Sequence, residues 1–204
     1  MMKPSLAAGL LAISTNASWA QGFDFGTFDM TSITQSVRAC ASQPSGCADQ
    51  LLHGPLAPLV WETIGAYRSY LFNQAEGRWK ALPDWFVATA QVYYPGLDLT
   101  QVRYAEEIQT VHGHHITWGP HIFFTSQLDL SRYEDVHVTL HELEHVRQYQ
   151  EAGGEGPFLT QYLSDSFRAV AEAGTIDVHG QLELEQAANA AADGLAGVVF
   201  SARP

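Results

Sequence analysis

The chain has 204 residues, of which 46% are hydrophobic and 16% charged, so it is long and apolar enough to bury a sizeable core and is not a disordered tail. Its formal net charge of -12 comes from 22 acidic and 10 basic residues. A surface this acidic repels phosphate backbones and anionic lipids, which excludes nucleic acid and membranes as expected partners.

Residues 1–20 have the pattern of a secretory signal peptide. An early lysine precedes a short apolar stretch from Leu6 to Ile13, and small residues follow at Ser18 and Ala20. The apolar stretch is too short to span a bilayer. We therefore predict an exported protein, periplasmic or extracellular, whose mature part does not insert into a membrane.

Residues 21–204 are predicted to form a single domain, in which residues 21–54 are a loosely packed lead-in with one short helix at 33–39. The lead-in holds the only two cysteines, Cys40 and Cys47. An exported chain meets an oxidising compartment, so two thiols flanking a Pro/Gly/Ser turn predict a disulfide. A metal pair is the alternative, but the spacing is wider than in the usual zinc knuckle and no second pair follows.

The remainder of the chain predicts an α+β fold that is mainly helical. Residues 101–125 are rich in β-branched and aromatic residues and predict two or three short antiparallel strands. Apolar spacing and stop signals predict helices over residues 55–75, 83–93, 133–151, 157–173 and 181–195. The expected architecture is thus a helical domain with a small antiparallel sheet before the helix at 133–151.

That helix contains the sequence HELEH. His141 and His145 are one helical turn apart on the same face, so both could present an imidazole nitrogen to one ion. Glu142 follows the first histidine, where it could accept a proton from a metal-activated water. This is the H-E-x-x-H pattern of zinc metallopeptidases, with zinc as the expected cofactor.

An accidental match on an exposed polar helix is the alternative interpretation. However, Val136, Leu140, Leu143 and Val146 form an apolar stripe, which predicts a helix packed into a core. Buried histidines are costly unless they are bonded, and a metal is one way to satisfy them. The stripe therefore favours a metal site.

A catalytic zinc site needs a third protein ligand. In a metzincin this ligand is a histidine close behind the motif, after a glycine. Gln148 stands where that glycine should be, and residues 150–154 contain no histidine. The metzincin class is therefore excluded, and the third ligand is expected from a later helix.

The alanine-rich helix at 181–195 carries the candidates. We prefer Glu185, because Asn189 lies one turn further on, where it could orient a histidine ligand. Glu183 is the second choice, and His179, in the loop before the helix, is the third. A single helical glutamate is commonly a solvated surface charge, so spacing alone leaves the choice open.

A second histidine cluster, formed by His112, His114, His115 and His121, invites a second metal site. No carboxylate or cysteine accompanies these residues, so none is predicted. One strand of this region is instead expected to form the rim of the cleft, where an extended peptide could add by backbone pairing.

The segments HELEHVRQYQ, FLTQYL and LEQAAN together resemble the HELxHVxQ metallopeptidase family of bacteria, a domain of unknown function also labelled an extracellular contractile injection system core domain. The resemblance covers roughly residues 80–195. It implies a gluzincin-like zinc site in a zincin-like domain, with His141, His145 and Glu185 as ligands and Glu142 as the base.

The function expected is that of an exported zinc-dependent hydrolase acting on a peptide or protein substrate. Glu142 would take a proton from metal-activated water and pass it to the leaving amine. A histidine or tyrosine is expected to stabilise the oxyanion, and Tyr162 and His179 are the candidates. The alternative is a zinc-stabilised, catalytically vestigial binding module of a secreted assembly. The intact Glu142 favours the enzyme, because a structural site needs no base.

Overall fold

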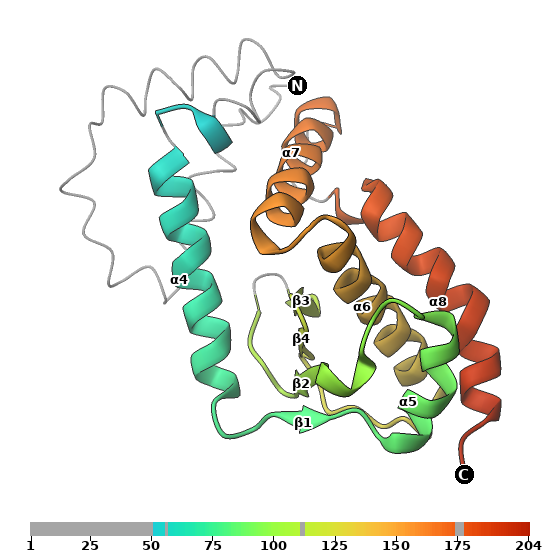
Figure 1. Cartoon of the computed structure of the whole chain (residues 1–204). Coiled ribbons are helices and arrows are strands. Elements are labelled where there is room, and N and C mark those ends of the chain that lie inside the picture. Colours follow the sequence, from blue (N-terminus) through green and yellow to red (C-terminus); the bar gives the residue numbers. More distant parts are fainter. Residues whose placement is uncertain (1–50, 56, 111–112, 174–177) are drawn as a thin grey trace, which may run out of the picture. The chain divides into compact units, whose positions relative to one another are not determined.

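The computed structural model describes residues 51–55, 57–110, 113–173 and 178–204 (Figure 1). The predicted signal peptide, the short helix at 33–39, both cysteines and His112 lie outside these residues. Contacts divide the chain into two compact units. The first unit comprises Leu71–Phe158 and Glu183–Pro204, and the second unit comprises the described residues of Met1–Tyr70 and Leu159–Leu182. The single domain expected over residues 21–204 stays a prediction.

The second unit contains most of the residues of two long helices, α4 and α7. Helix α4 spans Ala57–Ala75 and α7 spans Glu155–Ala173, and a short 3-10 helix, η6, follows at His179–Gln181. Both long helices begin within a turn of their predicted positions. Proline at the predicted start of each segment is compatible with a first helical turn, because the amides of that turn have no partner within the helix.

The first unit contains the sheet and the helices that surround it. Its elements are β1 (Lys80–Ala81), α5 (Asp84–Ala90), η3 (Gln91–Tyr93), η4 (Leu99–Gln101), β2 (Arg103–Ala105), β3 (Ile116–Trp118), β4 (His121–Phe123), α6 (Tyr133–Glu151) and α8 (Glu183–Ser201). The α+β class and the position of the sheet before α6 are confirmed. Helix α6 has the predicted ends, whereas α8 continues beyond 195, because Ala196 and Val199 are fully buried and packing outweighs the cost of two glycines.

The four strands are arranged in the order β1-β2-β4-β3. The pairs β1–β2 and β3–β4 are antiparallel, but β2 and β4 are parallel, with Arg103 opposite His121. The prediction of an antiparallel sheet is therefore wrong for this central pair. The reason is topological: β3 and β4 form a hairpin across Gly119, which has a φ of 58°, and the hairpin docks on β2 through its second strand. The alternation of apolar and polar residues along each strand does not indicate whether two strands pair in parallel or antiparallel.

Helix α6 packs against α8 and also contacts β3 (Figure 1). On α8, the residues facing the core recur at intervals of three and four; they are Glu185, Ala188, Ala192, Ala196 and Val199. Alanines in this stripe allow the two helices to approach closely, and Leu140 and Leu143 of α6 join the same core. Glu185 is the first member of the stripe, which places a carboxylate in the interface between the two helices.

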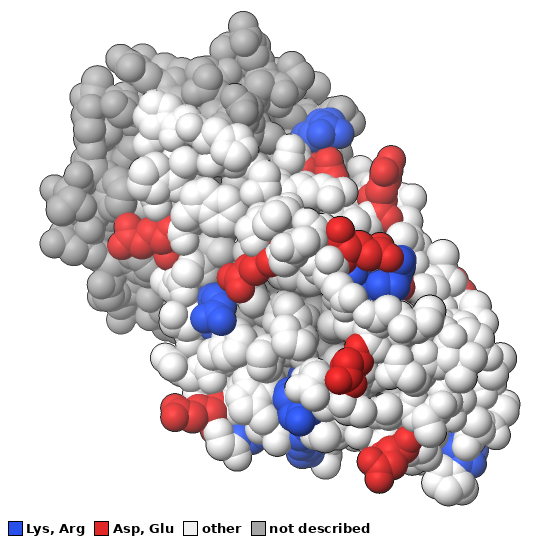
Figure 2. All heavy atoms as spheres, viewed as in Figure 1, with Lys and Arg blue, Asp and Glu red and all other residues white. Residues whose placement is uncertain are grey.

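Acidic and basic side chains are scattered over the face shown in Figure 2 and form no continuous patch of one sign there. Within the described part of the chain, no helix is both long enough and apolar enough to cross a membrane.

Candidate metal centre

Three side chains from α6 and α8 converge on one point. The Nε2 atoms of His141 and His145 are 3.2 Å apart. Oε2 of Glu185 lies 3.3 Å from Nε2 of His141 and 3.4 Å from Nε2 of His145. These short distances bring the three side chains together as a group that could hold a metal ion. No other group of three or more His, Cys, Asp or Glu side chains with this geometry occurs among residues the structure describes.

The helices impose this arrangement. His141 and His145 are one turn apart on α6, so their rings lie on the same face. Glu185 stands in the first turn of α8 and is only 2% exposed. A buried carboxylate is costly unless a cation lies beside it. Here the cation can be a protonated imidazole or a metal ion bound by both rings. The group is thus built for a positive charge at its centre.

A second layer of polar groups orients both rings. Nδ1 of His141 lies 3.0 Å from Oδ1 of Asn189, and Nδ1 of His145 lies 2.8 Å from Oε1 of Gln148. An amide oxygen only accepts hydrogen bonds, so each Nδ1 carries a proton and each Nε2 is directed to the shared point. Gln148 also donates from its amide to the carbonyl of Leu184, 2.9 Å away. It therefore couples a histidine of α6 to the residue next to Glu185.

Protonation of His145 responds to the neighbouring carboxylates. Burial lowers the pKa of its imidazole, but the contacts with Glu185 and Glu142 outweigh burial and raise the pKa to about 9. The metal-free ring is therefore an imidazolium at neutral pH. Because a metal ion needs the Nε2 lone pair, a proton and an ion compete for this atom.

Glu142 lies beside His141 in α6, but its side chain is bonded to the sheet and not to the metal group. It is 4% exposed, and its Oε2 accepts a hydrogen bond of 2.7 Å from the hydroxyl of Thr117 in β3. The same hydroxyl lies 3.2 Å from the backbone carbonyl of Glu142. None of the described residues donates a hydrogen bond to the other carboxylate oxygen, Oε1. One oxygen of Glu142 is therefore held by the sheet, and the other is available to a substrate or water.

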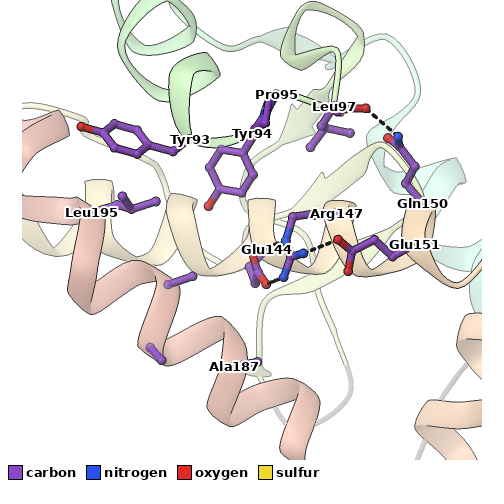
Figure 3. Close-up of a pocket in the computed structure, with 13 residues that line it drawn as sticks. Tyr93, Tyr94, Pro95, Leu97, Glu144, Arg147, Gln150, Glu151, Ala187 and Leu195 are labelled. Atoms are coloured by element: carbon purple, nitrogen blue, oxygen red, sulfur yellow. Dashed lines mark hydrogen bonds and ion pairs between the residues drawn. The ribbon is translucent and has the colours of Figure 1, made fainter.

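The second glutamate of the motif, Glu144, points away from Glu142, because side chains two residues apart on a helix lie about 200° apart around its axis. It is 3% exposed and forms an ion pair with Arg147, which also binds Glu151 (Figure 3). These residues line a cavity of about 680 Å³ together with Tyr93, Tyr94 and alanines of α8. The pairing with Glu144 raises the pKa of the Arg147 guanidinium. Glu144 is thus committed to a cation of its own chain and is not part of the metal group.

The structure also locates the remaining residues singled out in the sequence. Glu183 is exposed on the first turn of α8, so of the two candidate glutamates it is Glu185 that lies beside the histidines. Asn189 contacts His141, as expected for an orienting residue. Tyr162 and His179 belong to the second unit, where the tyrosine hydroxyl and Nδ1 of the histidine are 3.2 Å apart.

Two polar contacts of this site were not anticipated from the sequence. The signal for Gln148 is its position, because a residue three after His145 on a helix lies on the same face. Thr117 gave no signal, because a threonine in a strand is ordinary. The contact of Thr117 with Glu142 depends on how β3 lies against α6.

A family model described as eCIS core domain matches residues 96–153. This segment contains β2, β3, β4 and α6, and with them His141, Glu142 and His145. The match ends before α8, so Glu185 lies outside it. No curated protein and no solved structure matches the chain. The resemblance to the eCIS core domain is thus confirmed for residues 96–153, and the metallopeptidase part of that resemblance stays a prediction.

Proposed function

We propose that this chain is a zinc-dependent hydrolase of peptide bonds, with His141, His145 and Glu185 as metal ligands and Glu142 as the general base. One observation carries the proposal. Two imidazoles and a buried carboxylate meet within 4.8 Å, and the residue next to the first histidine is a second carboxylate held in place by Thr117. A site that only binds metal has no use for this second carboxylate.

The donor set fits zinc. Two imidazole nitrogens and one carboxylate oxygen are the three protein ligands found in many catalytic zinc sites, which leave a further position open. Asn189 and Gln148 orient the two rings in the way that such sites require. When bound, zinc would polarise a substrate carbonyl and activate water.

Glu142 would move the proton. Its Oε2 is occupied by the hydroxyl of Thr117, so Oε1 is the atom that would accept a proton from the attacking water. The same atom would then pass the proton to the leaving amine nitrogen. Thr117 fixes the carboxylate for both transfers and itself neither gains nor loses a proton.

The position of β3 favours a peptide over other amides. Among the described residues, this strand lies at the edge of the sheet and pairs only with β4. An extended peptide can add to such an edge through backbone hydrogen bonds. Since Thr117 of the same strand contacts Glu142, a peptide bound there would present its bonds close to the base.

Replacement of the base tests this function. We expect the Glu142→Gln variant to retain zinc, measured by elemental analysis, and to lose cleavage of a peptide library by roughly 100- to 10,000-fold. Glu134→Gln is the matched control, because Glu134 is exposed in the first turn of the same helix. Equal cleavage by wild type and Glu142→Gln would contradict the assignment.

The match to the eCIS core domain supports a second candidate, a metal-stabilised module of a secreted assembly. In that case zinc links α6 to α8, Glu142→Gln is silent, and His145→Ala loses both metal and thermal stability. A chelated protein with an unchanged melting temperature would contradict this candidate. Both candidates include export to the periplasm or the outside.

A further inference from the structure

His115 lies on the α6 side of the sheet. It directly precedes β3 and is two residues before Thr117, and side chains two apart along an extended segment share a face. Thr117 on this face contacts Glu142. The ring of His115 packs edge-on against the buried Phe124, with 5.4 Å between centroids. The ring therefore stands on the face that carries the contact to the general base.

The protonation of the His115 ring follows from its partner. The backbone N–H of Thr125 donates to Nδ1 of His115 over 3.1 Å, and the hydroxyl of Thr125 is 3.2 Å from the same atom. A backbone N–H can only donate, so Nδ1 has no proton and the neutral ring carries its proton on Nε2. No partner for Nε2 occurs among the residues that the structure describes.

The surroundings keep this ring neutral. Burial is the largest effect and lowers the pKa of His115, the charge of Glu142 raises it and His141 lowers it. The influence of Glu142 and His141 means that the ring lies within electrostatic reach of the metal centre. His115 is thus a half-buried imidazole with an N–H donor, close enough to Glu142 and His141 for their charges to act on it.

We propose that His115 is a catalytic residue whose Nε2–H donates a hydrogen bond to the carbonyl oxygen of the scissile bond. This assignment rests on the proposed hydrolase function. As the water oxygen bonds to the carbonyl carbon, the π electron pair moves to the carbonyl oxygen and the water proton moves to Glu142. The pair then reforms the C=O bond, the C–N bond breaks, and Glu142 protonates the nitrogen. His115 stabilises the oxygen while it is negative and keeps its own proton throughout.

Two substitutions separate the donor from the structural contact. In His115→Asn, the amide oxygen can replace Nδ1 as acceptor for Thr125, but the donor at the Nε2 position is lost. In His115→Gln, the amide nitrogen can reach the Nε2 position, but the acceptor for Thr125 is lost. A catalytic donor therefore predicts that Asn is the more damaging change for the reaction, and a merely structural role predicts that Gln is. His114→Gln is the control, because His114 is the exposed neighbour.

The experiment uses the zinc-loaded full chain and two readouts. The first is kcat and KM on a peptide that wild type cleaves, and the second is the affinity for N-phosphoryl-leucinamide, a tetrahedral anion, by titration calorimetry. We expect His115→Asn to lower kcat about 100-fold with KM within about twofold, and to weaken probe binding at least about 10-fold. His115→Gln should retain more of both, and all variants should bind zinc as wild type does.

The outcomes distinguish this assignment from the hydrolase function. If wild type cleaves peptides and His115→Asn has the same kcat and probe affinity, His115 is not the donor and the hydrolase stands; Tyr162→Phe and His179→Gln then test the other candidates. If the Gln variant is the more damaged one, the residue is structural and the proposal is overturned. If zinc-loaded wild type neither cleaves peptides nor binds the probe, both proposals fall.

Discussion

The hydroxyl of Thr117 in β3 lies 2.7 Å from the carboxylate of Glu142 in α6. This hydrogen bond ties the edge of the sheet to the proposed general base. A valine at position 117 has the same shape but no donor, so it would leave a buried carboxylate oxygen unsatisfied, which costs about 1–3 kcal/mol.

We therefore expect Thr117→Val to lower kcat about 10-fold, because the carboxylate loses its fixed orientation. The melting temperature should fall, whereas zinc affinity should stay within about twofold of wild type, since Thr117 contacts no proposed ligand. Thr117→Ser restores the hydroxyl and should recover most of the activity. Activity assays and thermal unfolding of both variants provide the measurement, and full activity in Thr117→Val would show that Glu142 needs no support.

Gln148 bridges Nδ1 of His145 and the carbonyl of Leu184. Gln148→Leu should weaken zinc binding roughly 10- to 100-fold, because the ring of His145 loses the partner that orients it. Competition with a chromophoric chelator measures the affinity. Gln127→Ala, an exposed glutamine outside the site, is the control and should bind zinc normally. Unchanged affinity in Gln148→Leu would mean that α6 alone orients the ring.

The raised pKa of His145 predicts opposite pH dependences with and without metal. In the metal-free chain the pKa rises from 6.5 to about 9 on folding, so this contact stabilises the fold fully below pH 6.5 and is lost as the pH rises through about 9. The contribution is on the order of 3 kcal/mol. Thermal unfolding of chelated protein between these pH values measures it, and His145→Gln should flatten the dependence.

Zinc binding should show the reverse trend, because the ion must displace the proton from Nε2 of His145. We expect affinity to increase with pH up to about 9 and about one proton to be released per ion at neutral pH. Calorimetry in buffers with different ionisation enthalpies counts the protons. Release of no proton at neutral pH would show that His145 is already deprotonated in the metal-free protein.

Packing between α6 and α8 positions Glu185 against the histidines. Ala192 is fully buried in this contact, so Ala192→Leu should destabilise the fold by about 1–3 kcal/mol through overpacking. It should also weaken zinc binding, because a displaced α8 carries Glu185 with it. Ala190→Leu on the exposed side of α8 is the control. A destabilised Ala192→Leu with normal zinc affinity would show that the ligand group does not depend on this packing.

Local sequence determined the helical part of the site. The four-residue spacing of His141 and His145 is a property of one helix, and so are the apolar stripe and both ends of α6. The periodic signal depends only on neighbours within a few residues. For the same reason it predicted the other long helices to within about a turn, but it did not predict the length of α8, whose last turns are supported by contact with α6.

Tertiary structure decided which partners meet these histidines. Glu183 and Glu185 both lie in the first turn of α8, and the register of α8 on α6 buries Glu185 and leaves Glu183 exposed. The packing of whole elements also places β4 parallel to β2 and Thr117 against Glu142. Such contacts join residues far apart along the chain, and their geometry follows from how whole elements pack, which the pattern within any one segment does not contain.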